Sequence, residues 1–269
     1  MKTKNNFRTR DIHRIHPTAV VHPNAKIGWN VTIGPYAVIG ENVTIGDHCM
    51  VGPHVSIDGW TTIGQGNRFF HGASIGYEPQ DLKFKNQKTF LFIGDNNIFR
   101  EYTTVNRGTE QGGGETRLGN NNVLMLYSHV AHDCHVGNGN LLENGSALGG
   151  HVMLEDHVVV GWMSGIHQFC KIGSIVTIGL MTKVTKDVPP FILVEGNPAK
   201  VAGLNEVGLR KNGIPPEVFT QIQLAYQILY HSKLALHKAI EEMEFKLQSS
   251  LEIDHFIRFI LNNKRGIQR

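Results

Sequence analysis

Aliphatic side chains recur at every sixth position along most of this chain, and a glycine often follows them. Small and polar residues fill the positions between, as in the hexads IGWNVT, IGPYAV and IGENVT. Helices and strands repeat their side-chain directions about every 3.6 and 2 residues, so a period of six belongs to neither. A hexapeptide period is typical of a β-helix, in which three hexads make one triangular coil. The pattern predicts stacked coils of short strands with the aliphatic side chains inside.

The repeat runs in two blocks, from Ile15 to Ile75 and from Leu118 to Val184. The count breaks at residues 77–92 and 106–117, and insertions into a solenoid emerge as loops, often on its binding face. The second insertion contains three consecutive glycines, but no phosphate-loop pattern or following helix accompanies them. We therefore expect a β-helix over residues 15–190 that carries two loops, preceded by a basic tail over residues 1–14.

The hexads stop at Asp187-Val188-Pro189-Pro190, and from Pro215 apolar residues recur at spacings of three and four. Residues 191–269 are therefore expected to form a connecting segment and a C-terminal helical domain. The apolar helix faces favour a packed bundle over a membrane-surface helix. No apolar stretch approaches the roughly 20 residues that cross a bilayer.

Composition narrows the function classes. The N-terminus is basic but lacks the apolar core of a signal peptide, so we expect a cytoplasmic protein. The net charge of +3 comes entirely from residues 200–269, which contain ten basic and seven acidic residues. This excess is too weak to predict nucleic-acid binding, and no nucleic-acid motif accompanies it. It suits an acidic protein partner and a merely solvated helical surface equally well.

The three cysteines follow the repeat. Cys49, Cys134 and Cys170 each lie four residues after an aliphatic repeat position, in a slot that elsewhere holds alanine or serine. This slot requires a small buried side chain, and a free cysteine behaves as a small hydrophobe. We predict neither a disulfide nor a cysteine–metal site.

Four histidines lie close together in the second block of repeats: His129, His132, His151 and His167. His132 comes two residues after Val130, so it should point out of the coil. The separations His132–His151 and His151–His167 are 19 and 16 residues, close to one 18-residue coil. A single outward histidine is usually only solvated, but three that stack on successive coils favour a functional site.

The segment Ser128-His129-Val130-Ala131-His132-Asp133-Cys134 resembles the active-site segment of the UDP-N-acetylglucosamine O-acyltransferases, the first enzymes of lipid A biosynthesis. The similarity extends over nearly the whole chain from about residue 15. The further matching segments are Gln80-Asp81-Leu82-Lys83, Arg100-Glu101, Asn106-Arg107-Gly108-Thr109, Glu110 to Gly114, Gly149-Gly150-His151, His167-Gln168-Phe169-Cys170, Asp187-Val188-Pro189-Pro190, Gly203-Leu204-Asn205 and Gly208-Leu209.

The resemblance implies a left-handed parallel β-helix with a C-terminal helical domain, assembled as a homotrimer with active sites between adjacent subunits. It also implies a reaction without a cofactor or a metal. A 3-hydroxyacyl chain passes from acyl carrier protein to the glucosamine 3-position of UDP-N-acetylglucosamine. An analogue with a 3-amino group remains open as the acceptor.

The same resemblance assigns roles. It makes His132 the general base, Asp133 the group that orients its ring, and Gly150 the backbone N–H donor to the thioester oxyanion. The residues implied to bind substrate are Asp81, Lys83, His129, His151, His167, Gln168, Asn205, Arg210 and Lys211.

The chain departs from the family pattern at three positions. Asn106 stands where His is common, and Lys211 stands where a phosphate-binding Arg is common. Lys keeps the charge but not the bidentate fork, for which the neighbouring Arg210 is the candidate substitute. Leu180 occupies the position of a Gly that ends the acyl groove in relatives using longer chains. We expect a preference for shorter acyl donors.

Three other functions fit parts of the pattern. The later N-acyltransferase of the same pathway normally has a uridine-binding domain before its repeats, and here the repeats begin at Ile15. A γ-class carbonic anhydrase is also a left-handed β-helix, but it needs three His around Zn²⁺. A catalytically silent scaffold would not need the His132-Asp133 pair.

Overall fold

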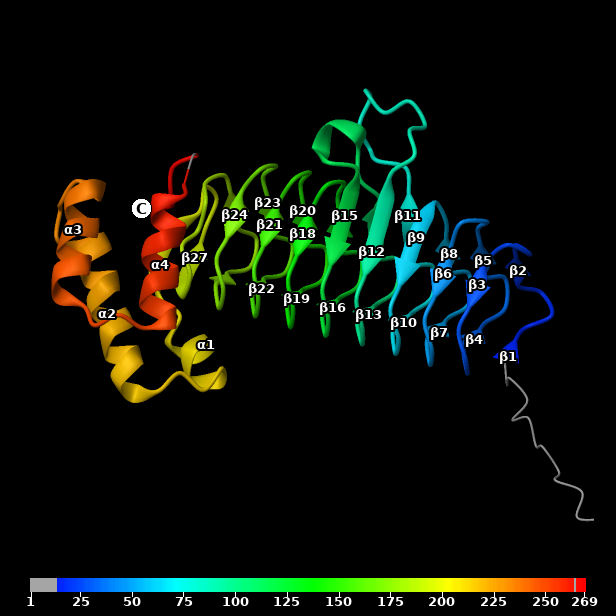
Figure 1. The fold of residues 1–269 in the computed structure, drawn as a ribbon, viewed down its shortest axis with the longest axis horizontal. Helices are drawn as coiled ribbons and strands as arrows, with labels where there is room; N and C mark the ends of the chain where they lie inside the picture. The colour runs from blue at the N-terminus through cyan, green and yellow to red at the C-terminus, as the bar shows by residue number, and fades with distance from the viewer. Residues whose placement is uncertain (1–13, 264) are drawn as a thin grey trace, which may run out of the picture.

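The computed structural model describes residues 14–263 and 265–269, and it places β-strand coils before a group of helices (Figure 1). The coils form a left-handed parallel β-helix of triangular section, and the predicted fold class is confirmed. The predicted N-terminal tail lies outside the described residues, except for Arg14.

Three sheets form the faces of the coils, and all strand pairs are parallel except the last, β27 with β28. The eleven-stranded sheet contains β1 (Arg14–Ile15), β4 (Thr32–Ile33), β7 (Met50–Val51), β10 (Arg68–Phe69), β13 (Ile98–Phe99), β16 (Val123–Leu124), β19 (Leu141–Leu142), β22 (Val159–Val160), β25 (Thr177–Ile178), β27 (Ile192–Glu195) and β28 (Lys200–Leu204). The nine-stranded sheet contains β2 (Val20–Val21), β5 (Val38–Ile39), β8 (Ser56–Ile57), β11 (Ser74–Tyr77), β14 (Thr104–Asn106), β17 (His129–Val130), β20 (Ala147–Leu148), β23 (Gly165–Ile166) and β26 (Lys183–Val184). The eight-stranded sheet contains β3 (Lys26–Ile27), β6 (Thr44–Ile45), β9 (Trp60–Ile63), β12 (Phe90–Ile93), β15 (Glu115–Leu118), β18 (His135–Val136), β21 (Met153–Leu154) and β24 (Lys171–Ile172).

The hexad aliphatics fill the interior, as the pattern predicted. From Ile33 to Val184 the repeat position is buried in every coil, and each side chain lies in register with its counterpart one coil away. The cysteines occupy buried corner positions, and burial raises the pKa of Cys134 to about 12. A thiol with so high a pKa packs as an apolar side chain and is inert as a nucleophile.

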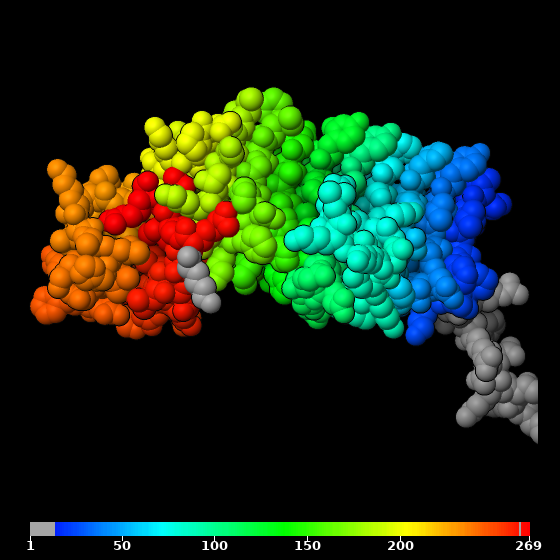
Figure 2. All heavy atoms as spheres, turned by 90° about the horizontal axis from the view of Figure 1, so that it is seen from above, coloured from blue at the N-terminus to red at the C-terminus, as the bar shows by residue number. Residues whose placement is uncertain are grey.

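Both inserted loops leave the same edge of the solenoid, where turns join the nine-stranded sheet to the eight-stranded sheet; we call this the loop edge. The irregular segments are residues 78–89, between β11 and β12, and 107–114, between β14 and β15, which includes the 3₁₀ turn η1 (Glu110–Gly112). They are shorter than the breaks in the hexad count because the flanking strands extend into them. Figures 1 and 2 show both loops standing out from the coils at this edge.

The C-terminal part contains a hairpin and a short helix that the sequence pattern did not indicate. Strands β27 and β28 pair antiparallel and extend the eleven-stranded sheet past the last hexads. Four helices follow: α1 (Glu206–Lys211), α2 (Pro216–His231), α3 (Leu236–Lys246) and α4 (Leu251–Leu261). The final residues return to the solenoid, where Ile267 bridges to Asp187. None of the described helices is both long enough and apolar enough to cross a bilayer.

Candidate active site

His132 and Asp133 occupy the turn at the loop edge between β17 and β18. Asp133 has a left-handed backbone, with φ of 58°, and its side chain is fully buried, whereas that of His132 is 14% exposed. Nδ1 of His132 lies 2.7 Å from Oδ2 of Asp133. This bond places the proton of the neutral ring on Nδ1 and leaves Nε2, which has no partner among the described residues, as a free acceptor.

Asp133 is held as an anion. Its burial alone would raise the pKa of the carboxyl, but hydrogen bonds from His132 and Thr109 outweigh burial and keep the pKa below its ordinary value. Thr109 donates its backbone N–H to Oδ1 at 2.7 Å and its hydroxyl to Oδ2 at 2.6 Å. Thr109 belongs to a segment that resembles the family, but the sequence pattern assigns it no role.

The next coil places Gly150 and His151 directly above this pair. The His151 and His132 rings meet edge to face with centroids 5.2 Å apart, and Nε2 of His151 lies 3.7 Å from Oδ2 of Asp133. A Cβ at position 150 would come within 2.6 Å of Cε1 of His132, so only glycine allows this approach. The Gly150 N–H makes no hydrogen bond within the described residues.

The predicted stack of three histidines is wrong in its third member. The residue one coil beyond His151 is Phe169, whose ring stacks on His151 at 4.3 Å and 10°. His167 lies two residues earlier, on the same turn, because its separation from His151 is short of a full coil. Its Nδ1 lies 2.9 Å from Nη2 of Arg265, a C-terminal residue that sequence reasoning missed.

Burial lowers the pKa of both His129 and His151, and nearby charges add to the shift or oppose it. The negative charges of Asp133 and Asp81 raise the pKa of His151 and so oppose the effect of burial. The Asp81 carboxylate of the first loop is therefore close enough to act on His151 electrostatically. Nδ1 of His129 lies 2.7 Å from the Thr104 hydroxyl. These histidines are therefore neutral hydrogen-bonding groups at pH 7.

The first loop is anchored from below by Arg107. Its buried guanidinium donates to the Gly76 carbonyl at 3.1 Å and lies over the Phe84 ring at 5.2 Å. Asp81 accepts the Lys83 backbone N–H at 2.9 Å, so these two residues form a tight turn at the exposed part of the loop. Gln168 is likewise exposed.

Asn106, one of the departures from the family pattern, is buried beside the same loop. Its Nδ2 donates to the Glu78 carbonyl at 2.8 Å, whereas its Oδ1 has no hydrogen-bond partner among the residues that the structure describes. This side chain ties the base of the loop to the coil.

Four predicted residues lie away from this cluster within one chain. Asn205 caps α1, accepting from Gly208 and donating to Ile175 and Thr177, so its amide hydrogens are both engaged. Arg210 and Lys211 are exposed on α1, which Figure 1 shows on the side opposite the loops. Leu180 is 63% exposed on the turn between the eleven- and nine-stranded sheets.

Distance alone would let His132, Asp133 and His151 hold a metal ion, because one ligand atom from each lies within 4.8 Å of the others. The donor set is two His and one Asp, not the three His of a γ-class carbonic anhydrase. Both Asp133 oxygens already accept hydrogen bonds, and Oδ2 accepts two. The geometry is that of a carboxylate-oriented base.

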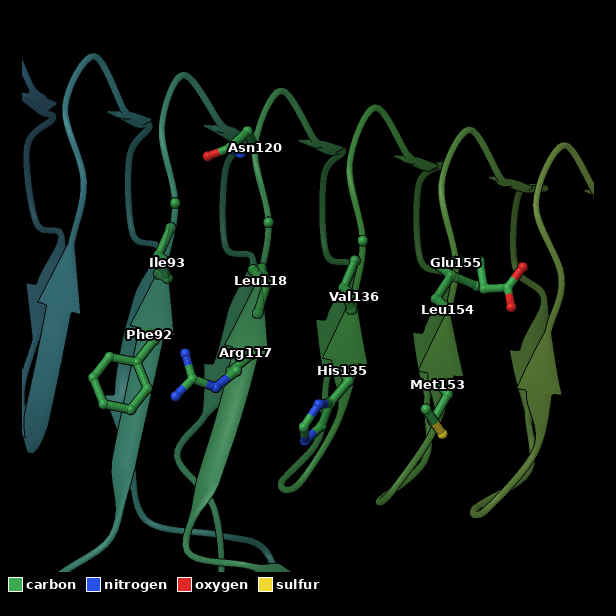
Figure 3. A pocket seen from close by; sticks show the side chains of 13 residues that line it. Phe92, Ile93, Arg117, Leu118, Asn120, His135, Val136, Met153, Leu154 and Glu155 are labelled. Atoms are coloured by element: carbon green, nitrogen blue, oxygen red, sulfur yellow. The ribbon is translucent and has the colours of Figure 1, made fainter. Parts of the chain in front are cut away.

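A hollow of about 550 Å³ lies beside the site, on the outer face of the eight-stranded sheet. Figure 3 shows Phe92, Arg117, His135 and Met153 projecting from four successive strands to line it. A second hollow shares Met153 and continues to α4, where it is lined by Lys171, Arg258 and Phe259. The two hollows also share Glu155, whose carboxylate bonds to His255, and they form one groove lined by apolar side chains, cations and this one carboxylate; we call it the outer groove.

Comparison with known proteins agrees with this geometry. Residues 187–268 match the family model described as UDP N-acetylglucosamine O-acyltransferase, domain 2, and residues 14–41 match the bacterial transferase hexapeptide model. The chain is 48% identical to the acyl-(acyl-carrier-protein)–UDP-N-acetylglucosamine O-acyltransferase of Anaeromyxobacter sp. Fw109-5, over 95% of this chain and 99% of that protein. The Aliarcobacter butzleri protein of the same name is 47% identical, over 95% and 98%.

Solved structures agree as well. LpxA from Acinetobacter baumannii superposes with a TM-score of 0.92 and 42% identity, over 95% of this chain and all of that one. UDP-N-acetylglucosamine O-acyltransferase from Moraxella catarrhalis gives 0.92 and 40%, with the same coverage.

Proposed function

Because the chain belongs to the family of acyl-(acyl-carrier-protein)–UDP-N-acetylglucosamine O-acyltransferases, we propose that it moves a 3-hydroxyacyl chain from acyl carrier protein to the 3-oxygen of the glucosamine ring, using His132 as general base. It is an acyltransferase, and its sequence aligns with these relatives over nearly their whole length. The observation that carries the residue assignment is the free Nε2 of His132, held by a buried, ionised Asp133 at the loop edge.

The chemistry requires a base because a sugar hydroxyl is a weak nucleophile at neutral pH. Nε2 of His132 takes the hydroxyl proton as the oxygen attacks the thioester carbon, and Asp133 stabilises the imidazolium. The tetrahedral intermediate then collapses, the C–S bond breaks, and the imidazolium returns the proton to the leaving thiolate. The products are the acyl ester and the carrier thiol.

Gly150 supplies the donor for the negative charge that develops on the thioester oxygen. Its N–H, which makes no hydrogen bond within the described residues, lies on the turn of the next coil, and the absence of a side chain lets the His132 ring approach it closely. Removing one such donor in other enzymes typically costs on the order of 100- to 1000-fold in rate.

The remaining loop-edge residues bind substrate in this proposal. Neutral His129 and His151 offer ring hydrogen bonds to the sugar, with His167 and Gln168 one coil further along. Asp81 and Lys83 reach over them from the first loop.

We further propose a homotrimer that completes the site with Leu180, Asn205, Arg210 and Lys211 of a neighbouring subunit. Support comes from the turns that join the eleven- and nine-stranded sheets, five of which expose large apolar side chains. These are Tyr36, Tyr102, Tyr127, Trp162, Met163, Leu180 and Met181. A contiguous exposed apolar strip of this kind marks a protein interface. Light scattering that gives the mass of one chain would contradict the assembly.

The donor's carrier protein fits the outer groove. The groove lining includes His135, which comes three residues after His132. Its Lys171 and Arg258 form no ion pair within the described residues. Its apolar floor and these two cations, beside a Glu155 carboxylate that His255 already engages, suit an acidic amphipathic helix. Lys171→Glu should raise the KM for acyl carrier protein thioester without changing that for an acyl-pantetheine thioester. Lys26→Glu, on the same sheet at the far end, is the matched control.

We assign the reaction to the first step of lipid A biosynthesis and the protein to the cytoplasm, where its carrier donor is made. Recovery of the native protein in the membrane fraction of lysed cells would contradict this location.

The decisive experiment supplies purified protein with a series of 3-hydroxyacyl carrier proteins and with UDP-N-acetylglucosamine or its 3-amino analogue, and identifies products by mass spectrometry. We expect the 3-O-acyl product from wild type and its loss in His132→Ala. His237→Ala, an exposed helix position, should be unaffected. Near-wild-type transfer by His132→Ala would refute the assigned base, and acylation of the amino analogue alone would change the acceptor.

A further inference from the structure

The second inserted loop, residues 107–114, closes directly onto the carboxylate of Asp133. Thr109 is buried, and the loop turns sharply after it through η1. At Gly112 an added Cβ would lie 2.0 Å from Cγ of Asp133, so the loop and the carboxylate are in contact with no space between them. The contact joins residues 24 positions apart, and sequence spacing gives no indication of it.

The hydrogen bonds in this contact have a fixed direction. Gly112 donates its N–H to the Thr109 hydroxyl oxygen at 3.1 Å, which occupies a lone pair of that oxygen. The hydroxyl hydrogen is then directed at Oδ2 of Asp133, 2.6 Å away, since an ionised carboxylate can only accept. Oδ2 is the same oxygen that accepts from Nδ1 of His132 at 2.7 Å.

We propose that Thr109 is a positioning residue for the acyl transfer, acting through Asp133 to keep His132 in its base-competent form. This inference rests on the proposed function, because it needs His132 to be the base. It assigns the second loop a role distinct from binding substrate: the loop completes the catalytic pair.

Two physical consequences follow from the second donor on Oδ2. It lowers the proton affinity of Asp133, so the imidazolium proton stays on the ring and is returned to the leaving thiolate. It also fixes the oxygen relative to the ring, which keeps the hydrogen on Nδ1 and the lone pair on Nε2.

The main chain of Asp133 is held separately. Its N–H donates to the Thr116 hydroxyl at 2.8 Å, and its left-handed backbone is part of the coil turn. Loss of the Thr109 hydroxyl therefore leaves the turn and the Thr109 N–H bond to Oδ1 in place.

The test compares Thr109→Val, which keeps the shape without the hydroxyl, with Thr109→Ser, which keeps the hydroxyl. The full-length enzyme is assayed with acyl carrier protein thioester and UDP-N-acetylglucosamine. We expect Thr109→Val to lower kcat about 10- to 100-fold, the range for one hydrogen bond to a charged group, with KM changed less than about threefold. Thr109→Ser should restore kcat to within about threefold.

The pH profile separates positioning from mere structural support. The Thr109 hydroxyl is one of the groups that hold the pKa of Asp133 down, so Thr109→Val should move the acidic limb of kcat/KM to higher pH. Thr103→Val is the matched control, because Thr103 is a buried threonine of the same coil whose hydroxyl donates to the Met125 carbonyl at 3.2 Å. It should leave the profile unshifted.

His132→Ala is assayed in parallel. If it is inactive while Thr109→Val keeps wild-type kcat and an unshifted profile, the inference on Thr109 is wrong and the proposed base stands. If His132→Ala is active, the proposed function of the pair itself fails. Should Thr109→Val melt far below wild type, Thr109→Cys replaces it, since a thiol keeps the volume but is a weak donor; wild-type behaviour of that variant overturns the inference equally.

Discussion

Replacing Asn97 with Ala tests how the coils are held in register. Four asparagines are buried in the corner between the eight- and eleven-stranded sheets, one in each successive coil: Asn67, Asn97, Asn122 and Asn140. The Asn97 amide nitrogen donates to Oδ1 of Asn67 and to the Gly119 carbonyl, both at 3.0 Å. Its oxygen accepts the backbone N–H of Asn122 at 2.8 Å and the side-chain amide of Asn122 at 3.0 Å.

The Asn97→Ala change removes all four of these side-chain bonds. At about 1 kcal/mol for each net hydrogen bond, the free energy of unfolding should fall by about 4 kcal/mol. The backbone N–H of Asn122 is left buried without an acceptor, and this desolvation cost keeps relaxation from recovering much of the loss. The expected loss is large compared with the 5–15 kcal/mol typical of whole domains.

The assay is urea denaturation followed by circular dichroism at one fixed protein concentration, because the midpoint of an oligomer depends on concentration. Asn42→Ala is the matched control: this asparagine is exposed in a turn, and its side chain makes no hydrogen bond to the part of the chain that the structure describes. Its change should stay within about 0.5 kcal/mol. If Asn97→Ala lowers the free energy of unfolding by less than about 1 kcal/mol, the view that the four stacked asparagines stabilise the coils is refuted.

Three other predictions address the site and the end of the solenoid. Leu180→Gly should favour donors longer by two methylenes about 15-fold in kcat/KM, since each buried CH₂ contributes about 0.8 kcal/mol; equal use of both donors in a competition assay would contradict this. Gly150→Ala should displace the His132 ring, because its Cβ would lie 2.6 Å from Cε1, and should lower kcat on the order of 100-fold with an unchanged melting temperature. Burial would raise the pKa of Glu155, but the hydrogen bond and charge of His255 together with two hydrogen bonds from Ser174 outweigh burial and hold the pKa low, so these contacts stabilise the fold at neutral pH. The stability that Glu155→Gln removes should therefore be fully present at pH 7, begin to fall below about pH 4.3 and be lost as pH passes through the lower pKa of the folded state. Urea denaturation at a series of pH values measures this.

The β-helix was predictable because its rule is local. Each hexad places one aliphatic residue inward and turns the chain at the next corner. The inward orientation of Ile33 or Leu148 can therefore be predicted from the neighbouring residues alone. The hairpin of β27 and β28 lacks that rule. It is held by pairing with β25 and by the C-terminal residues that return to Asp187, and neither contact leaves a period in the sequence.

The candidate site was predictable only in part, for the same reason. His132, Asp133 and His151 lie on coil turns, so counting in eighteens brings them to one edge. Phe169 stacks on His151 because it lies 18 residues, or one full coil, after it, whereas His167 lies only 16 residues after it. Thr109 lies on an insertion whose path the count cannot follow.

The site also shows why the insertions and the proposed catalytic residues share one edge of this solenoid. Asp133, His151 and Phe169 have left-handed backbones, with φ of 58°, 61° and 68°, and each projects a side chain outward from a turn without entering the core. A change at these positions leaves the inward aliphatic residues and their strand pairing intact. The same holds for residues 78–89 and 107–114, which leave and rejoin the coil between paired strands. The coils therefore hold their turns at a fixed spacing along one edge. The loop over residues 107–114 folds back onto this edge, and its Thr109 hydroxyl gives Oδ2 of Asp133 a second hydrogen-bond donor that the repeat itself does not provide.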